Sequence, residues 1–157
     1  GVVKNFDEDG SLRNTEPYKN GLKHGLFQNF YDNVDQNLVS TYDFHKTSTY
    51  KNGKPHGLFE SYYWNDQLKE KKSYKDGKYH GPYEEYYENS QLKYKTNFKD
   101  GLRDGYSERY YENGNLWITS NYKNGKSHGK TEYYFEQGNK SSTTIYLLGE
   151  VISKVKY

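Results

Sequence analysis

The sequence predicts an all-β fold, an elongated single-layer antiparallel solenoid of stacked β-hairpins, from three observations. First, the pattern Asn/Asp-Gly-x-x-x-Gly recurs five times, with its first glycines at Gly21, Gly53, Gly77, Gly101 and Gly125. Second, the last three intervals between these glycines are each 24 residues, and a fixed period of this size indicates a repeat protein. Third, a pair of aromatic residues follows every motif, whereas no apolar stripe of helical period occurs.

The repeats divide the chain, which its length suggests is one domain over 1–157, into segments of the same internal order. The predicted segments are 1–20 (half a repeat), 21–52 (a first repeat with an eight-residue insertion), 53–76, 77–100, 101–124 and 125–148 (repeats two to five) and 149–157 (a C-terminal cap).

Each repeat is expected to hold two turns and two strands of about seven residues, giving some eleven or twelve strands in all. Asn-Gly and Asp-Gly favour type I′ hairpin turns, because both residues tolerate positive φ. Strand side chains alternate between faces, so Leu68, Glu70 and Tyr74 are expected on one face. Stacked repeats would then form a leucine ladder beside a Tyr/Phe ladder, and each aromatic pair would contribute about 0.2–1 kcal/mol.

The composition limits the classes of function. The chain has 23 Lys+Arg against 21 Asp+Glu, and this near balance argues against a nucleic-acid binder, which would carry a strong basic excess. Hydrophobic residues make up only 31%, which alone would suggest disorder, but 20 Tyr at periodic positions indicate a fold that buries tyrosine rings. The absence of cysteine excludes disulfides and thiol catalysis, and no apolar run is long enough to cross a membrane.

The repeat motif carries a family resemblance. The segment 77–89, Gly-Lys-Tyr-His-Gly-Pro-Tyr-Glu-Glu-Tyr-Tyr-Glu-Asn, followed by Leu92, resembles the bacterial variant of the MORN repeat, as do 52–57 and 124–129. Many bacterial proteins of this variant are labelled YwqK-type antitoxins, so the resemblance implies a non-catalytic protein-binding scaffold with an immunity role against a partner toxin. The chain departs from the pattern at Asp104, where the other repeats have histidine, and in the eight extra residues of the first repeat.

The recurring histidines invite a metal hypothesis, which the predicted spacing rejects. His24, His56, His80 and His128 occupy equivalent positions, which lie two strand spacings apart, about 9.6 Å. Zinc requires its nitrogen ligands at about 2.1 Å, so neighbouring histidines cannot share an ion. We expect no metal or cofactor, and we expect each histidine to close a turn between hairpins.

Catalysis finds little support in the sequence. No nucleophile-elbow, zinc-protease or phosphate-loop motif is present. Carboxylates such as Glu84, Glu85, Glu108 and Glu132 are scattered along the predicted strands. We therefore predict no catalytic residues and no enzyme activity.

Features that occur in only one repeat are better candidates for function. Tyr42 and Phe44 lie in the long connection of the first repeat, where a projecting hairpin would expose them as a binding hot spot. The alternative is an insertion that folds back onto the first repeats. Trp64 and Trp117 are unique in their columns and are expected either to contact a partner or to pack in the core. The predicted partner-binding set is completed by the ladder residues Tyr74, Phe98 and Tyr122.

A line of lysines suggests an alternative function. Lys51, Lys75, Lys99 and Lys123 occupy one column beside the turns, so one rim is expected to be basic while the opposite rim is acidic. A solvated rim that discourages edge-to-edge association is one interpretation. The other is a membrane-surface adaptor that binds anionic lipid headgroups, in which case the affinity would fall with salt.

The ends of the chain give two further expectations. The apolar tail 145–152 is expected to cap the open edge of the sheet, or to pair with a second copy, so the protein would be a monomer or an edge-paired dimer. The chain begins at Gly1 without methionine, which is consistent with a cleaved tag or a removed leader. We expect a cytoplasmic location, with the cell envelope or secretion as the alternative if a leader was removed.

Overall fold

A computed structural model describes residues 1–8, 10, 12–30 and 45–157. These residues form sixteen strands and no helix, so the predicted all-β class is confirmed. Since no helix is formed, none of the described residues belongs to a helix that could cross a membrane. The chain divides into two compact units, Gly1–Lys78 and Tyr79–Tyr157. The segment boundaries of the repeats stay a prediction.

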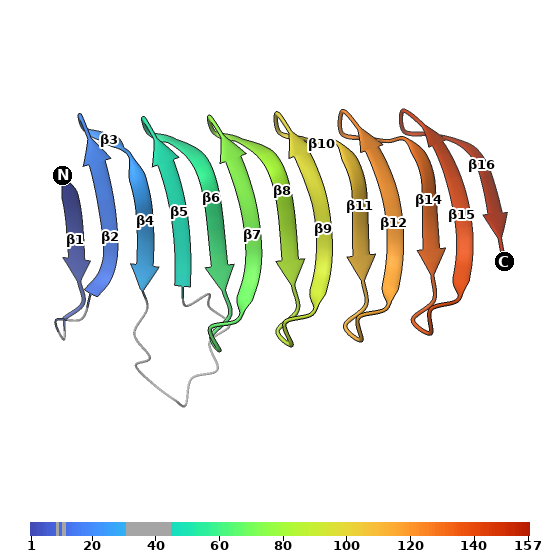
Figure 1. Cartoon of the computed structure of the whole chain (residues 1–157), viewed down its shortest axis with the longest axis horizontal. Coiled ribbons are helices and arrows are strands. Elements are labelled where there is room, and N and C mark those ends of the chain that lie inside the picture. Colours follow the sequence, from blue (N-terminus) through green and yellow to red (C-terminus); the bar gives the residue numbers. More distant parts are fainter. Residues whose placement is uncertain (9, 11, 31–44) are drawn as a thin grey trace. The chain divides into compact units, whose positions relative to one another are not determined.

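The first unit is an open antiparallel sheet whose strands stand side by side in the order β1-β2-β4-β5-β6-β7, with the short β3 paired to β2 (Figure 1). Its strands are β1 (Val2–Phe6), β2 (Leu12–Lys19), β3 (Leu22–Lys23), β4 (Gly25–Phe30), β5 (His45–Lys51), β6 (Lys54–Tyr62) and β7 (Leu68–Lys75).

The second unit is also an antiparallel sheet, in the order β8-β9-β11-β12-β14-β15-β16, with β10 paired to β9 and β13 paired to β12. Its strands are β8 (Lys78–Tyr86, which begins one residue before the boundary), β9 (Leu92–Lys99), β10 (Leu102–Arg103), β11 (Gly105–Tyr110), β12 (Leu116–Lys123), β13 (Lys126–Ser127), β14 (Gly129–Tyr134), β15 (Lys140–Leu147) and β16 (Glu150–Lys156). The strand count exceeds the expected eleven or twelve partly because short two-residue strands precede some of the longer ones.

The turns have the backbone conformation that the sequence predicts. Asn52 and Gly53 have φ of 50° and 79°, as both central residues of a type I′ turn require. At the opposite turns, Asp66 and Ser90 replace the glycine of other repeats and adopt φ of 60° and 66°. Short polar side chains tolerate this left-handed region better than bulky ones, so the substitutions leave the hairpins intact.

A β-bulge that recurs in four hairpins, β6/β7, β8/β9, β11/β12 and β14/β15, overturns one sequence-based expectation. Simple alternation places Leu68 on the same face as Glu70. In the structure Leu68 lies opposite Tyr62, whereas Glu70 lies opposite Ser61, because the register shifts between Ser61 and Tyr62. Since two consecutive strand residues point to opposite faces, Leu68 and Glu70 do not share a face, and the predicted leucine ladder beside the aromatic ladder is wrong. Equivalent shifts recur in later hairpins.

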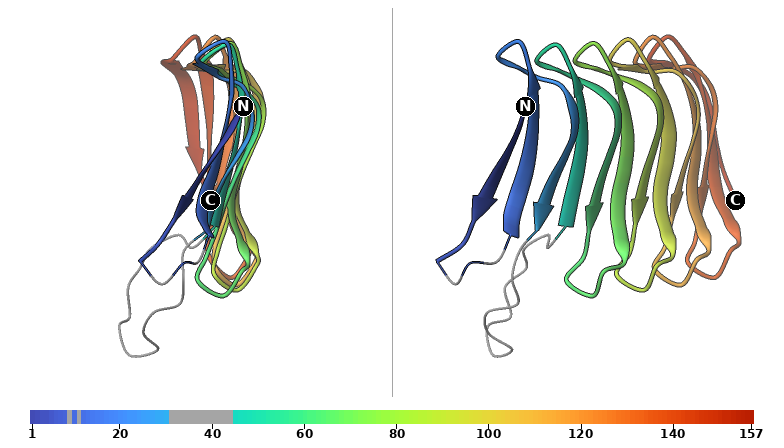
Figure 2. Two further views of the ribbon diagram at one scale, coloured as in Figure 1. Left: turned by 90° about the vertical axis from the view of Figure 1, so that its left-hand side faces the viewer. Right: turned by 60° about the vertical axis from the view of Figure 1, so that its left-hand side comes forward.

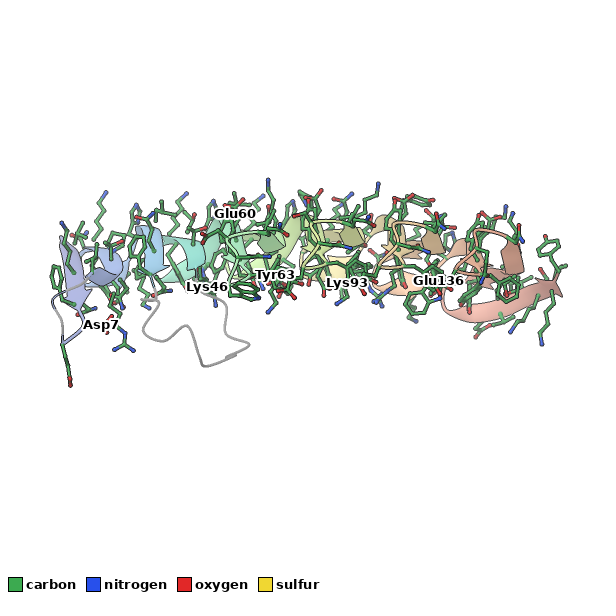
Figure 3. The ribbon with its side chains drawn as sticks, turned by 90° about the horizontal axis from the view of Figure 1, so that it is seen from below. Asp7, Lys46, Glu60, Tyr63, Lys93 and Glu136 are labelled. Atoms are coloured by element: carbon green, nitrogen blue, oxygen red, sulfur yellow. The ribbon has the colours of Figure 1, made fainter. Side chains whose placement is uncertain are left out.

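The strands of each unit form one curved layer (Figure 2), and its two faces differ in packing. In each unit one face carries the most buried hydrophobic side chains, with exposed fractions of 6–7%: Phe27 and Phe59 in the first unit and Tyr94 in the second. We call it the ladder face. The other carries Glu60, Glu84, Glu108 and Glu132 and is called the glutamate face. Figure 3 shows Glu60 on one side of the first unit and Lys46, a ladder-face residue opposite Ser61, on the other.

Candidate binding surface

Hydrogen bonds between successive turns fix the position of each repeat. Nδ1 of His80 accepts a hydrogen bond from the backbone N–H of Asp100 at 3.4 Å, and His24 and His56 accept equivalent bonds. Asp104, which replaces the histidine, accepts through its carboxylate at 3.2 Å. The expectation that histidines close the turns is confirmed for these three. Among the described residues, no group of three or more His, Cys, Asp or Glu side chains could hold a metal ion.

Aromatic rings form a continuous row on the ladder face of the first unit. The ring centroids are separated by 4.6–5.9 Å, within the range of favourable aromatic contacts. The row runs across five strands and contains Tyr18, Phe27, Tyr50, Phe59 and Tyr74. These contacts supply an apolar core to a sheet that has a single layer.

In the second unit the aromatic row gives way to stacked arginines. Tyr83 contacts Tyr94 at 5.7 Å between ring centroids. Beyond Tyr94, the guanidinium of Arg109 lies 4.4 Å from the centre of that ring, and the guanidinium of Arg103 lies 4.0 Å from the centre of the Tyr122 ring. Both distances are within the range of cation–π contacts, so two positive charges lie over tyrosine rings.

The change follows from a loss of side-chain bulk in one column. The position of Phe59 and Tyr83 is occupied in the next two repeats by Ser107 and Thr131, both only 4% exposed. Burial opposes ionisation of the Tyr94 hydroxyl, but hydrogen bonds from Ser107 and its other neighbours, with the positive charge of Arg103, outweigh it and lower the pKa of Tyr94.

On the glutamate face, the carboxylates that the sequence suggested were scattered fall into one recurring contact. The Tyr86 hydroxyl donates to Glu84 Oε2 at 2.9 Å, and burial together with this bond raises the pKa of Tyr86 to about 12. The same Glu-x-Tyr bond recurs in Glu60/Tyr62, Glu108/Tyr110 and Glu132/Tyr134. Each of these glutamates therefore accepts a hydrogen bond from a tyrosine of its own repeat.

Lysines neutralise several of these glutamates. Lys130 Nζ lies 2.6 Å from Glu132 Oε1, and Lys140 donates to the same oxygen. These two hydrogen bonds lower the pKa of Glu132 to about 2, against the opposing effect of burial. On the ladder face, Glu85 accepts from Lys93 at 2.6 Å. The carboxylates therefore act as ion-pair partners within the sheet.

The repeat geometry and the sequence pattern agree with one family. Four stretches, 1–20, 55–76, 79–100 and 103–124, match the model of the MORN repeat variant and together make up more than half of the chain. The chain belongs to the MORN repeat variant family. No curated protein matches it at the level of significance applied. MORN repeats are generally non-catalytic modules that bind proteins or membranes, and this is the class of function that the sequence predicts.

The two tryptophans of the MORN repeats lie at the surface rather than in a core. Trp64 is 61% exposed in the turn after β6, and Trp117 is 40% exposed on β12. The Trp117 ring packs against Tyr111 with 5.7 Å between centroids, which fixes its orientation. Both belong to the predicted partner-binding set, and a role in binding stays a prediction.

The other predicted contact residues have different environments. Tyr74, Phe98 and Tyr122 are half-buried, and all three pack against rings or cations on the ladder face, so they present only part of each ring to solvent. Tyr42 and Phe44 lie outside the described residues.

The lysine column lies where the sequence places it. Lys51 and Lys75 in the first unit, and Lys99 and Lys123 in the second, are exposed at the ends of strands that lead into the Asn/Asp-Gly turns. Exposed leucines lie beside these turns in two MORN repeats, Leu22 at 49% and Leu102 at 51%. Each unit therefore has a basic rim with an interspersed apolar residue.

The C-terminal tail forms the final hairpin of β15 and β16. Every residue of β16 is exposed, including Val151, Ile152 and Val155 at 51–59%. The tail therefore adds an edge strand to the last MORN repeat and leaves its own apolar side chains uncovered within the chain. Pairing with a second copy stays a prediction.

Sequence reasoning missed Arg103 and Arg109. The chain has only three arginines, and these two fall in the same repeat. Each is the sole arginine in its repeat column, which is the criterion that singled out the tryptophans. Their stacking on Tyr122 and Tyr94 depends on residues from neighbouring strands, so the sequence pattern alone does not reveal it.

Proposed function

We propose that this protein is a non-catalytic scaffold that binds a partner protein, and that it acts as an antitoxin or immunity protein by occluding a toxin. The observation that carries the proposal is the exposure of two tryptophans, Trp64 in the turn after β6 and Trp117 on β12. Tryptophan is enriched among residues that dominate binding energy, and a rigid support reduces the entropy lost on association. Membership of a family of binding modules supports the same class of function.

The proposal includes the sequence-predicted contacts. Tyr42 and Phe44, and the exposed parts of Tyr74, Phe98 and Tyr122, would also contact the partner. If Tyr42→Ala/Phe44→Ala leaves the affinity for the partner unchanged, these two residues do not take part. The proposed location is the cytoplasm, with the cell envelope as the alternative, and fractionation of the native cell separates the two.

Affinity capture from the native cell extract at moderate salt tests the proposal. We expect one protein in stoichiometric amount, which is toxic when expressed alone and harmless when co-expressed with this chain. Trp64→Ala/Trp117→Ala is expected to abolish capture, whereas Leu147→Ala, a control with an exposed fraction of 53%, is not. A captured partner that is not toxic alone contradicts the antitoxin role, and no stoichiometric partner contradicts protein binding.

A membrane-surface adaptor is the second candidate, because the basic rims carry exposed leucines as well as lysines. Leu22 lies beside the turn at Gly53 that follows Lys51, and Leu102 lies opposite Lys99 and beside the turn at Gly125 that follows Lys123. Each rim would thus place cations and an apolar side chain against a headgroup layer. Flotation with vesicles that contain phosphatidylserine tests it. Binding at low salt that is lost when all four lysines are changed to Gln favours the adaptor, and no binding at low salt rejects it.

A further inference from the structure

Two guanidinium groups on the ladder face of the second unit are held in fixed positions by tyrosines. Arg109 covers the ring of Tyr94 at 4.4 Å, and Arg103 covers the ring of Tyr122 at 4.0 Å. The charge of Arg103 also acts on the Tyr94 hydroxyl, so Tyr94 lies between the two cations. We call Arg103, Arg109, Tyr94 and Tyr122 the arginine patch. Stacking on a ring restrains the guanidinium plane. Since a guanidinium has five N–H donors, the hydrogen bond of Arg103 to Tyr94 leaves other donors available.

Neither guanidinium of the arginine patch has an ion-pair partner among the described carboxylates. Arg13 in the first unit, by contrast, lies 3.8 Å from Asp7. On the opposite face of the second unit, Lys95 pairs with Glu108 and Lys130 pairs with Glu132. In the second unit, these lysines of the glutamate face are therefore paired with carboxylates, whereas the two arginines of the ladder face are not paired with any carboxylate that the structure describes.

The ladder face of the second unit carries two further cations on β16, four strands away from β11 in the sheet. Lys154 and Lys156 on β16 lie opposite Thr144 and Ser142, which places both lysines on the ladder face. Among the described strands of the second unit, the carboxylate on this face is Glu85, which already accepts a hydrogen bond from Lys93. The ladder face of this unit is thus basic although the whole chain carries a charge of only +2.

The repeat does not require arginine at either position. The Arg103 column holds Pro55 and Ser127 in other repeats. The Arg109 column holds Ser61 and Tyr133. Each of these residues supports the same hairpin, so the two arginines are a property of one repeat rather than of the fold.

We propose that the arginine patch is the part of the surface that receives a carboxylate-rich segment of the partner protein. This inference rests on the proposed protein-binding function. The planar guanidinium donates two parallel N–H bonds to a carboxylate, and such charge-assisted bonds are stronger than neutral ones. The half-buried Tyr122 beside Arg103 offers part of its ring to the rest of an extended acidic segment, whereas the buried Tyr94 serves to position Arg109. Nucleic acid fits less well, because the opposite face carries a row of glutamates and the net charge is small.

Fluorescence anisotropy with a labelled peptide of alternating glutamate and glycine tests the proposal at low ionic strength. We expect measurable binding that Arg103→Gln/Arg109→Gln weakens about tenfold or more, since bonds to charged groups are worth about 1.5–3 kcal/mol. The matched control is Arg13→Gln/Lys46→Gln, which removes the same charge from the first unit, where Lys46 is an exposed lysine of the ladder face, and is expected to change binding little. Arg103→Lys/Arg109→Lys is expected to recover only part of the affinity, because an ammonium lacks the planar fork.

Three outcomes overturn the proposal. They are no binding of the glutamate peptide to the native chain, equal loss in the control variant, or tighter binding of single-stranded oligothymidine than of the peptide. The same arginine variants in the affinity capture separate this inference from the proposed function. Capture of the partner at native strength by Arg103→Gln/Arg109→Gln contradicts the arginine patch alone, whereas absence of any partner contradicts the proposed function and leaves the peptide result to decide the inference.

Discussion

Lys130 and Glu132 lie two residues apart on β14, and their charged atoms are 2.6 Å apart. With Lys140 on the next strand, Lys130 lowers the pKa of Glu132 from its ordinary value of 4.5 to about 2. The folded state therefore releases the proton of Glu132 more readily than the unfolded chain does. By linkage, this glutamate stabilises the fold at pH above about 4.5, and the stabilisation is lost as the pH falls to about 2.

The first prediction concerns this acid sensitivity. Glu132→Gln is expected to lower the free energy of unfolding at pH 7 by about 1–2 kcal/mol, which allows for screening of the exposed lysines. Below pH 2 the variant and the native chain should differ little. Denaturant titrations at several pH values measure this difference, and a difference that stays constant between pH 7 and pH 2 would contradict the ion-pair account.

A second prediction follows from the charge of Arg103. Removing it in Arg103→Gln is expected to raise the pKa of Tyr94, because a nearby cation favours the phenolate. Nuclear magnetic resonance of ring-labelled tyrosine, assigned with Tyr94→Phe, follows this titration. Lys99→Gln, which removes a rim cation, serves as the control and should leave the pKa of Tyr94 unchanged. If the pKa of Tyr94 is unaltered in Arg103→Gln, the charge of Arg103 does not act on the Tyr94 hydroxyl.

The aromatic row predicts where the first unit is most sensitive to truncation. Phe59 is 7% exposed and contacts Tyr50 and Tyr74 at 5.6 and 4.6 Å between ring centroids. Phe59→Ala is expected to cost about 2–4 kcal/mol in the free energy of unfolding. Leu58→Ala, at the preceding position and 38% exposed, is expected to cost less than about 1 kcal/mol. Equal costs in chemical denaturation would show that the row is not the core.

The fourth prediction distinguishes a hydrogen-bond acceptor from a histidine as such. His80→Leu removes the acceptor for the Asp100 N–H and is expected to cost about 1 kcal/mol. His80→Asp is expected to retain most of that stability, since Asp104 accepts the equivalent bond in the next repeat. Thermal unfolding compares the variants, and amide exchange at Asp100 reports the bond itself. If His80→Asp is as unstable as His80→Leu, the hydrogen bond between the turns requires an imidazole acceptor.

The sequence predicts the turns and the repeat well because each depends on residues that are close along the chain. Asn52-Gly53 adopts the positive φ values expected of it, and histidine closes the turn in three repeats. The faces of Leu68 and Glu70 were not predictable, because the bulge that separates them depends on pairing across the hairpin. Period-2 alternation holds only while the register is constant.

The candidate surface was predicted only in part. The exposure of Trp64 and Trp117 agrees with the hypothesis that they contact a partner. The sequence singled them out because each occurs at its repeat position in only one repeat. The arginine patch was missed because its charges are defined by what they stack on, and Tyr94 and Arg109 come from different strands. A net charge near zero also hides the arginine patch, because it sums over the whole chain, whereas the patch depends on two arginines that are not paired with described carboxylates.

The bonds between turns connect each repeat only to the repeat before it. The N–H of Gly101 donates to Tyr79 O, and the N–H of Gly125 donates to Arg103 O, both at 2.8 Å and both through main-chain atoms. Because these bonds use only main-chain atoms, they do not depend on the side chains of the two repeats that they join. Unequal recombination that copies or deletes one 24-residue module would therefore leave every remaining joint unchanged, so this architecture tolerates variation in gene length while single-copy residues such as Arg109 are free to diverge.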